Sequence, residues 1–208
     1  MGKIFNCSLV LVWASVFVLT GCSLVKNNNA SNNSKLEDIS QYKQVNEYVC
    51  CDKDVSNDVI NSVNELMNKV PYKLADTFKE HNGKVVVTSN LENKNIGKTI
   101  IDDKTKDVII YIQPKNIDYS LLHEFGHVYL AYNNIDKDEF HSIFKEEAKS
   151  LVTAYYGEEG NVDYYYDDET EYFAQAFQTV LMLGGHDTLN SAPKTFDYMT
   201  SIITDLYK

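Results

Sequence analysis

Five consecutive residues, His123-Glu-Phe-Gly-His127, carry the residue types of a metal-dependent hydrolase. In a helix, residues i and i+4 lie on one face a turn apart, so both imidazoles can bind one metal ion. Glu124 lies about 100° around the helix from His123, close enough to act on a water without binding the metal. Zinc lowers the pKa of such a water toward about 7, and a neighbouring carboxylate can take its proton. The segment therefore predicts a Zn²⁺ site with His123 and His127 as ligands and Glu124 as general base.

Zinc of this type needs a third protein ligand and keeps one position for water. Two glutamates compete: Glu147 lies 20 residues beyond His127, and Glu171 lies 44 residues beyond it. The helical period puts Ala174 on the same face as Glu171, and this small residue would let the second helix approach the first. The segment 140–149, in contrast, has the pattern of an amphipathic helix whose charges face solvent. The periodicity therefore favours Glu171.

The elements around this motif divide the chain into two halves at Pro114. Before it, short β-branched runs alternate with helical patterns, and after it only the helical period recurs. The predicted helices span 54–70, 73–81, 118–133, 137–155, 168–183 and 193–207. The predicted strands span 84–88, 98–102 and 108–112, the last two joined as a hairpin, and 108–112 is a candidate edge strand for pairing with substrate. The fold class is therefore α+β, with a small mixed α/β N-terminal half and a helical C-terminal half.

The first 21 residues predict a secretion signal rather than part of the fold. Lys3 supplies a positive start, residues 4–19 form an apolar run, and Leu19-Thr-Gly-Cys22 places small residues before a cysteine. This resembles a bacterial lipoprotein signal, in which the cysteine is lipidated and becomes the new N-terminus. The apolar run, at about 16 residues, is short for a membrane-spanning helix. We expect residues 1–21 to be the signal peptide and Cys22 to carry lipid; the alternative is an uncleaved membrane anchor.

The remaining chain divides into a tether and one domain. Residues 22–35 contain the lipidated Cys22 and an Asn- and Ser-rich segment typical of a flexible linker, which leaves 36–208 as the domain. Cys50 and Cys51 are the only cysteines after Cys22. Adjacent cysteines bridge each other poorly, and two thiols alone do not make a metal site. They are either incidental or an intermolecular link.

The charge balance excludes two classes of partner. The chain has 19 basic residues, all of them lysine, against 30 acidic ones, for a net charge of -11. Nucleic-acid binding needs a basic face, and electrostatic adhesion to anionic lipid needs clustered cations. We therefore expect no nucleic-acid partner and membrane contact through the lipid anchor only. We also expect a monomer that is lipid-anchored at the bacterial cell surface, with release from the surface as a further alternative.

Four ordered segments resemble the catalytic domain of anthrax lethal factor and the related Pro-Pro endopeptidases. They are His123-Glu-Phe-Gly-His127, Ile143-Phe-Lys-Glu-Glu147, Glu171-Tyr-Phe-Ala-Gln-Ala-Phe177 and Ala192-Pro-Lys-Thr-Phe196. The resemblance covers roughly residues 105–208. It implies a zincin-like metallopeptidase domain in which His123, His127 and Glu171 bind one Zn²⁺ and Glu124 is the general base.

The same resemblance implies a catalytic tyrosine. Family members have a tyrosine seven residues before the glutamate ligand, where its phenol can stabilise the oxyanion. That position here is Tyr164, with Tyr165 and Tyr166 beside it. Tyr156 is the rival if the loop carries an insertion, and an aromatic loop without a catalytic role is the remaining alternative.

Together these features predict a cell-surface zinc-dependent endopeptidase that hydrolyses peptide bonds of extracellular proteins. Cleavage at proline-containing sites would follow from the Pro-Pro branch of the resemblance. The only tryptophan, Trp13, lies in the signal segment, so an aromatic platform for proline rings would have to come from tyrosine or phenylalanine.

The alternative is a non-catalytic surface lipoprotein, either a binding or adhesion module or a degenerate protease scaffold. The presence of the complete motif together with Glu171 favours the enzyme. The other histidines, His81, His141 and His186, have the sequence settings of surface residues rather than ligands.

Overall fold

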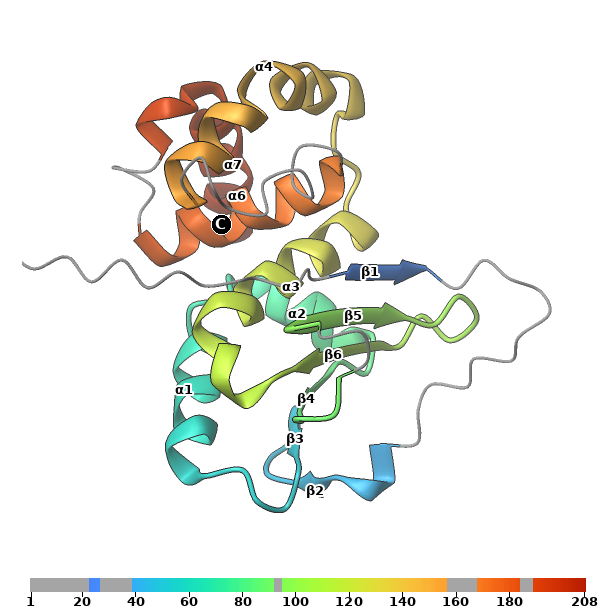
Figure 1. The fold of residues 1–208 in the computed structure, drawn as a ribbon. Helices are drawn as coiled ribbons and strands as arrows, with labels where there is room; N and C mark the ends of the chain where they lie inside the picture. The colour runs from blue at the N-terminus through green and yellow to red at the C-terminus, as the bar shows by residue number, and fades with distance from the viewer. Residues whose placement is uncertain (1–22, 27–38, 92–94, 157–167, 184–188) are drawn as a thin grey trace, which may run out of the picture.

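A mixed β-sheet organises the N-terminal half of the protein (Figure 1). The computed structural model describes residues 23–26, 39–91, 95–156, 168–183 and 189–208. The strands are β1 (Ser23–Lys26), β2 (Lys43–Gln44), β3 (Val49–Cys51), β4 (Lys84–Val87), β5 (Gly97–Ile101) and β6 (Val108–Ile112). Their order is β1-β5-β6-β4-β3-β2, with β4 parallel to β3 and β6, and β5 antiparallel to β6. The sheet thus combines a parallel centre with a hairpin.

The hairpin of β5 and β6 agrees with the prediction, but its place in the sheet does not. Every residue of β6 is buried, and β6 pairs with β5 on one side and β4 on the other. A strand that is apolar on both faces is typical of a sheet interior. The prediction that 108–112 is an edge strand for substrate is therefore wrong.

Strand β1 was not predicted. Its residues were assigned to the flexible tether, but they pair in parallel with β5, from Ser23 opposite Lys98 to Lys26 opposite Ile101. The tether prediction is wrong for these four residues. The proposed signal peptide, the lipidation site at Cys22 and the rest of the tether lie outside the described residues.

Helices α1 (Asn57–Met67) and α2 (Tyr72–Glu80) contribute one side of the main core. Ser56 caps the N-terminus of α1, its side chain accepting a hydrogen bond from the backbone N–H of Val59, and Pro71 precedes α2. Their apolar side chains pack on the sheet and on α3 (Ile117–Tyr132); these include Ile60, Val63, Leu66, Leu74 and Phe78. The opposite face of the sheet carries a small second cluster built on Cys50, Val86, Ile109 and Tyr111.

The C-terminal half is helical, as predicted, and the fold class is α+β. It consists of α4 (Lys137–Tyr156), α6 (Glu169–Leu183) and α7 (Pro193–Leu206) with short 3₁₀ turns. Figure 1 shows α3 running between this helical half and the sheet. Helix α3 therefore belongs to both halves and is the element around which the site is built.

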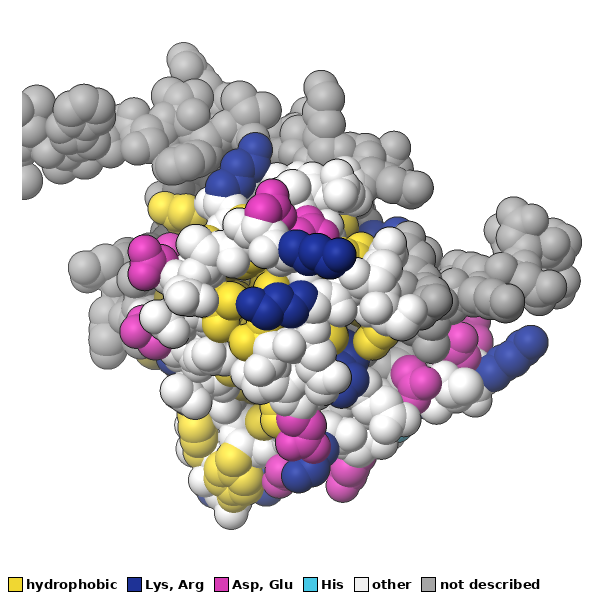
Figure 2. All heavy atoms as spheres, turned by 90° about the horizontal axis from the view of Figure 1, so that it is seen from below, with side chains coloured by type: hydrophobic (Ala, Val, Ile, Leu, Met, Phe, Trp, Pro, Cys, Tyr) yellow, Lys and Arg dark blue, Asp and Glu magenta, His cyan; other side chains and the backbone are white. Residues whose placement is uncertain are grey.

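Figure 2 shows one face of the molecule with its side chains coloured by type. On the side of the described chain that Figure 2 shows, lysine and acidic side chains are interspersed among uncharged ones. Within the described ranges, no helix is both long and apolar enough to cross a membrane.

Cys50 and Cys51 are free thiols buried on opposite faces of β3, because successive strand residues point to opposite sides. An intermolecular link needs an accessible sulfur, so their burial argues against that interpretation. Burial also raises the pKa of both thiols, which makes them less reactive.

Candidate metal centre

Helix α3 brings the sequence motif into the interior. Eleven of its 16 residues are buried, which is typical of a helix enclosed by other elements. His123, Glu124 and His127 are at most 1% exposed. Three buried polar side chains need hydrogen-bond or charge partners, because removing them from water is costly.

Helix α6 provides a charged partner for the two histidines, Glu171, which lies in its first turn. Asp168 precedes the helix, and its side chain accepts hydrogen bonds from the backbone N–H groups of Thr170 and Glu171. The two helices approach closely: a Cβ added at Gly126 would lie only 2.7 Å from the Cα of Ala174. Gly126 and Ala174 thus let α6 present Glu171 to the motif, as the predicted small residue on the Glu171 face suggested.

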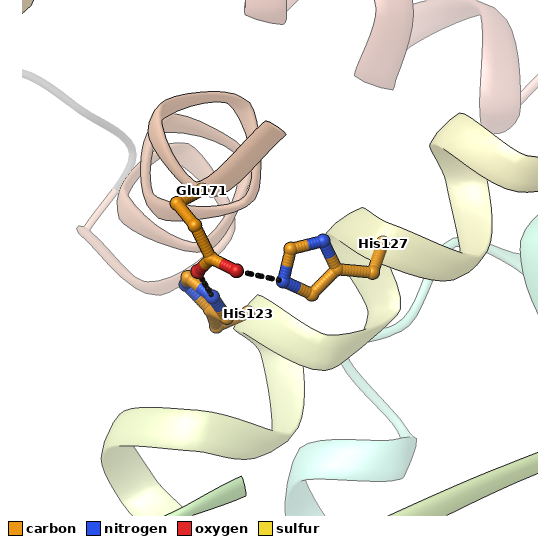
Figure 3. A group of neighbouring side chains, drawn as sticks. All are labelled: His123, His127 and Glu171. Atoms are coloured by element: carbon orange, nitrogen blue, oxygen red, sulfur yellow. Dashed lines mark hydrogen bonds and ion pairs between the residues drawn. The ribbon is translucent and has the colours of Figure 1, made fainter. Parts of the chain in front are cut away.

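The three candidate ligands converge (Figure 3). The Nε2 of His123 lies 3.1 Å from Oε2 of Glu171, and the Nε2 of His127 lies 3.4 Å from Oε1 of the same carboxylate. One potential ligand atom from each residue lies within 4.8 Å of the others. Within the described chain, the Nδ1 of His127 is buried without a hydrogen bond, and its Nε2 has only the ion pair with Glu171. Two imidazoles and one carboxylate are the ligand types that Zn²⁺ takes in catalytic sites, so these three side chains fit a Zn²⁺ ion.

The charges of the site are strongly coupled. Burial alone would raise the pKa of Glu171, but the close contacts with His123 and His127 and the charge of both imidazoles outweigh it and lower that pKa to about 2. Burial alone would lower the pKa of His127, yet Glu171 and Glu124 raise it. Burial raises the pKa of Glu124 against the opposing effects of His127, His123 and a hydrogen bond from Thr99. Two carboxylates among two imidazoles make this interior position attractive to a divalent cation.

Glu124 lies against strand β5. The hydroxyl of Thr99 donates a hydrogen bond of 2.6 Å to Oε2 of Glu124, and Oε1 makes none within the described part of the chain. Gly97 borders the same carboxylate. Neither residue was among the predicted site residues. In the strand, burial alternates along 97–101 and places Thr99 on the inner face with Gly97, but nothing in the local sequence indicates that Glu124 is its partner.

Glu147, the other candidate for the third ligand, lies at the start of α7 instead of at the histidines. It is 6% exposed, and its carboxylate accepts hydrogen bonds from the backbone N–H groups of Lys194 and Thr195 and from the Thr195 hydroxyl. It therefore caps the N-terminus of α7. The expectation that the charges of 140–149 face solvent is wrong for Glu147. The backbone N–H groups at the start of α7 need a hydrogen-bond acceptor, and the carboxylate of Glu147 is that acceptor.

The remaining histidines and the candidate oxyanion tyrosines lie partly within and partly outside the described residues. His141 is about half exposed, with its Nδ1 3.0 Å from Glu169, and His81 stacks on the ring of Tyr132. Tyr164, Tyr165, Tyr166 and His186 lie outside the described residues, and Tyr156 ends α4 without a described side chain. The structure therefore does not test the position of the oxyanion tyrosine.

The fold and the site together define a class: a metallopeptidase-type domain with a histidine pair on an interior helix and a glutamate on a second helix. The family model described as anthrax toxin lethal factor, N- and C-terminal domain, matches residues 94–202, just over half of the chain. The protein therefore belongs to the anthrax lethal factor family, as the four sequence segments indicated.

A solved structure supports the same fold. The chain is similar to the Pro-Pro endopeptidase PPEP-2 from Paenibacillus alvei, with a TM-score of 0.53 and 21% sequence identity. The similarity covers 75% of this chain and 96% of that one. No curated relative matches the chain. At this identity the likeness establishes the fold, and the activity has to be argued from the site.

Proposed function

We propose that this protein is a zinc-dependent endopeptidase that hydrolyses peptide bonds of extracellular proteins. The convergence of His123, His127 and Glu171 carries the proposal, since their potential ligand atoms lie within 4.8 Å of one another beside Glu124. Membership of the lethal factor family supports a metallopeptidase. The three residues would hold one Zn²⁺ per chain.

The chemistry follows from the roles of these side chains. When bound, zinc supplies a Lewis acid that polarises the scissile carbonyl and activates water. Glu124 is the general base: it takes a proton from the attacking water and later delivers it to the leaving amine. Thr99 already occupies Oε2 of Glu124, which leaves Oε1 as the oxygen for proton transfer. Tyr164, as the residue that stabilises the oxyanion, remains a prediction of the family resemblance.

Substrate preference and location are finer parts of the proposal. The similar solved structure is named a Pro-Pro endopeptidase, which supports cleavage at proline-containing sites. The segment Leu19-Thr-Gly-Cys22 supports lipid attachment at Cys22 and anchorage at the bacterial cell surface. A non-catalytic surface lipoprotein remains the alternative function.

The decisive experiment compares the wild type with Glu124→Ala. We measure zinc stoichiometry and cleavage of a peptide library, and map the cut sites to identify the preferred sequence. We expect one zinc in each protein and a loss of activity of about 1,000-fold in the variant, because general acid–base catalysis typically contributes 10²–10⁴-fold.

The control for this experiment is His141→Ala, which removes a surface histidine paired with Glu169 and should leave zinc and activity unchanged. Absence of bound zinc, or equal activity of wild type and Glu124→Ala, would contradict the proposal. A zinc-loaded wild type that cleaves no library peptide would instead support the non-catalytic alternative.

A further inference from the structure

Two alternate residues of β5 lie against the side chain of Glu124. Gly97 and Thr99 are buried on the inner face of the strand, whereas Lys98 between them is partly exposed. Residues i and i+2 of a strand point to the same side, so both face α3. The strand thus forms one wall of the space that holds this carboxylate.

Thr99 fixes one oxygen of the carboxylate. Its hydroxyl lies 2.6 Å from Oε2 of Glu124, and both residues are fully buried. The same hydroxyl is 3.4 Å from the backbone carbonyl of Glu124, so the shorter bond to the carboxylate dominates. A hydrogen bond to a carboxylate is stronger than a neutral one, and low polarity strengthens it further.

Gly97 has no side chain and so leaves room for the other oxygen, Oε1 of Glu124. A Cβ added at this position would lie 2.5 Å from Oε1 of Glu124, 3.2 Å from its Cδ and 3.1 Å from the Cβ of Ser120. Any larger residue would have to displace the carboxylate. The side chain of Glu124 is therefore held by a donor on one side and limited by the strand backbone on the other.

We propose that Gly97 and Thr99 are positioning residues for the general base. The inference rests on the proposed function, in which Glu124 moves a proton between water and the leaving amine. Such a base has to remain within hydrogen-bond reach of the reacting proton, and a displacement of about 1 Å can reduce the rate about 100-fold. Neither residue binds the metal, so their effect falls on the chemical step.

The test uses Thr99→Val, which has nearly the same shape and no hydroxyl, and Thr99→Ser, which keeps the hydroxyl. For Thr99→Val we expect kcat to fall about 10- to 100-fold with little change in KM and with full zinc occupancy. Thr99→Ser should recover most of the lost kcat. Thermal unfolding of each variant confirms that the comparison is made on folded protein.

Thr195→Val is the matched control. It removes another buried threonine hydroxyl that donates to a glutamate, here Oε2 of Glu147 at 2.9 Å, and that also lies 2.6 Å from the Tyr172 hydroxyl; it contacts neither Glu124 nor a proposed zinc ligand. It should lower stability and leave kcat unchanged. If Thr195→Val lowers kcat as much as Thr99→Val does, general destabilisation explains the loss and the inference is overturned.

Gly97→Ala provides an independent variant, which also decides the matter if Thr99→Val does not fold. We expect kcat to fall by about 100-fold while zinc remains bound, because the new methyl group displaces the carboxylate. Wild-type kcat in folded Gly97→Ala or Thr99→Val overturns the inference, even where Glu124→Ala is inactive. Failure of the proposed function would be distinct, because Glu124→Ala would then match the wild type.

Discussion

Two buried glutamates in the helical half of the protein show what distinguishes a ligand from a structural residue. Glu171 is 2% exposed and Glu147 is 6% exposed. The carboxylate of Glu171 faces two imidazoles across the contact between α6 and α3, whereas that of Glu147 faces backbone amides at the start of α7. A buried carboxylate always needs partners. The chemistry of those partners, rather than burial, determines whether the carboxylate can bind a metal.

The helix contacts around Glu171 and Glu147 also differ in whether the nearby polar groups have hydrogen-bond partners. Gly126 and Ala174 bring α3 and α6 close together, and among the described residues the Nδ1 of the buried His127 finds no hydrogen-bond partner there. At Glu147 both carboxylate oxygens accept hydrogen bonds, and the neighbouring Glu146 forms a surface ion pair with Lys194. The first region has capacity for a ligand and the second does not.

The largest effect is expected from Glu171→Gln. The substitution keeps the shape of the side chain but removes the charge that compensates the two imidazoles. Zinc affinity should fall by more than about 100-fold, the upper range for residues that only support ligands, and peptidase activity should fall with it. Competition with a chelator measures the affinity. Zinc binding that equals the wild type would show that Glu171 is not a ligand.

A smaller effect is expected from Gly126→Ala, which tests whether the close helix contact serves the site. The new methyl group would lie 2.7 Å from the Cα of Ala174, a backbone atom that cannot move without shifting α6. We expect zinc affinity to fall about tenfold or more, because the carboxylate moves away from the histidines. An unchanged affinity would mean that the position of Glu171 does not depend on this contact.

Local patterns predicted much of this arrangement. The helical period located α3, α6 and α7, and the spacing within His123-Glu-Phe-Gly-His127 identified the histidine pair. The errors concern contacts that are distant in sequence. The interior position of β6 depends on its pairing with β4, and the burial of Glu147 depends on residues 47 and 48 positions later. No local periodicity contains that information.

The smallest effect on activity is expected from Glu147→Gln, the same chemical change at the second buried glutamate. Its carboxylate now accepts three hydrogen bonds from Lys194 and Thr195, and an amide nitrogen in place of one oxygen would face a donor instead of accepting it. The free energy of unfolding of the zinc-free protein should fall by about 1–3 kcal/mol, as measured in urea. Zinc stoichiometry and kcat should equal those of the wild type, since this carboxylate touches neither histidine. If Glu147→Gln loses zinc while Glu171→Gln keeps it, the roles assigned to the two glutamates are reversed.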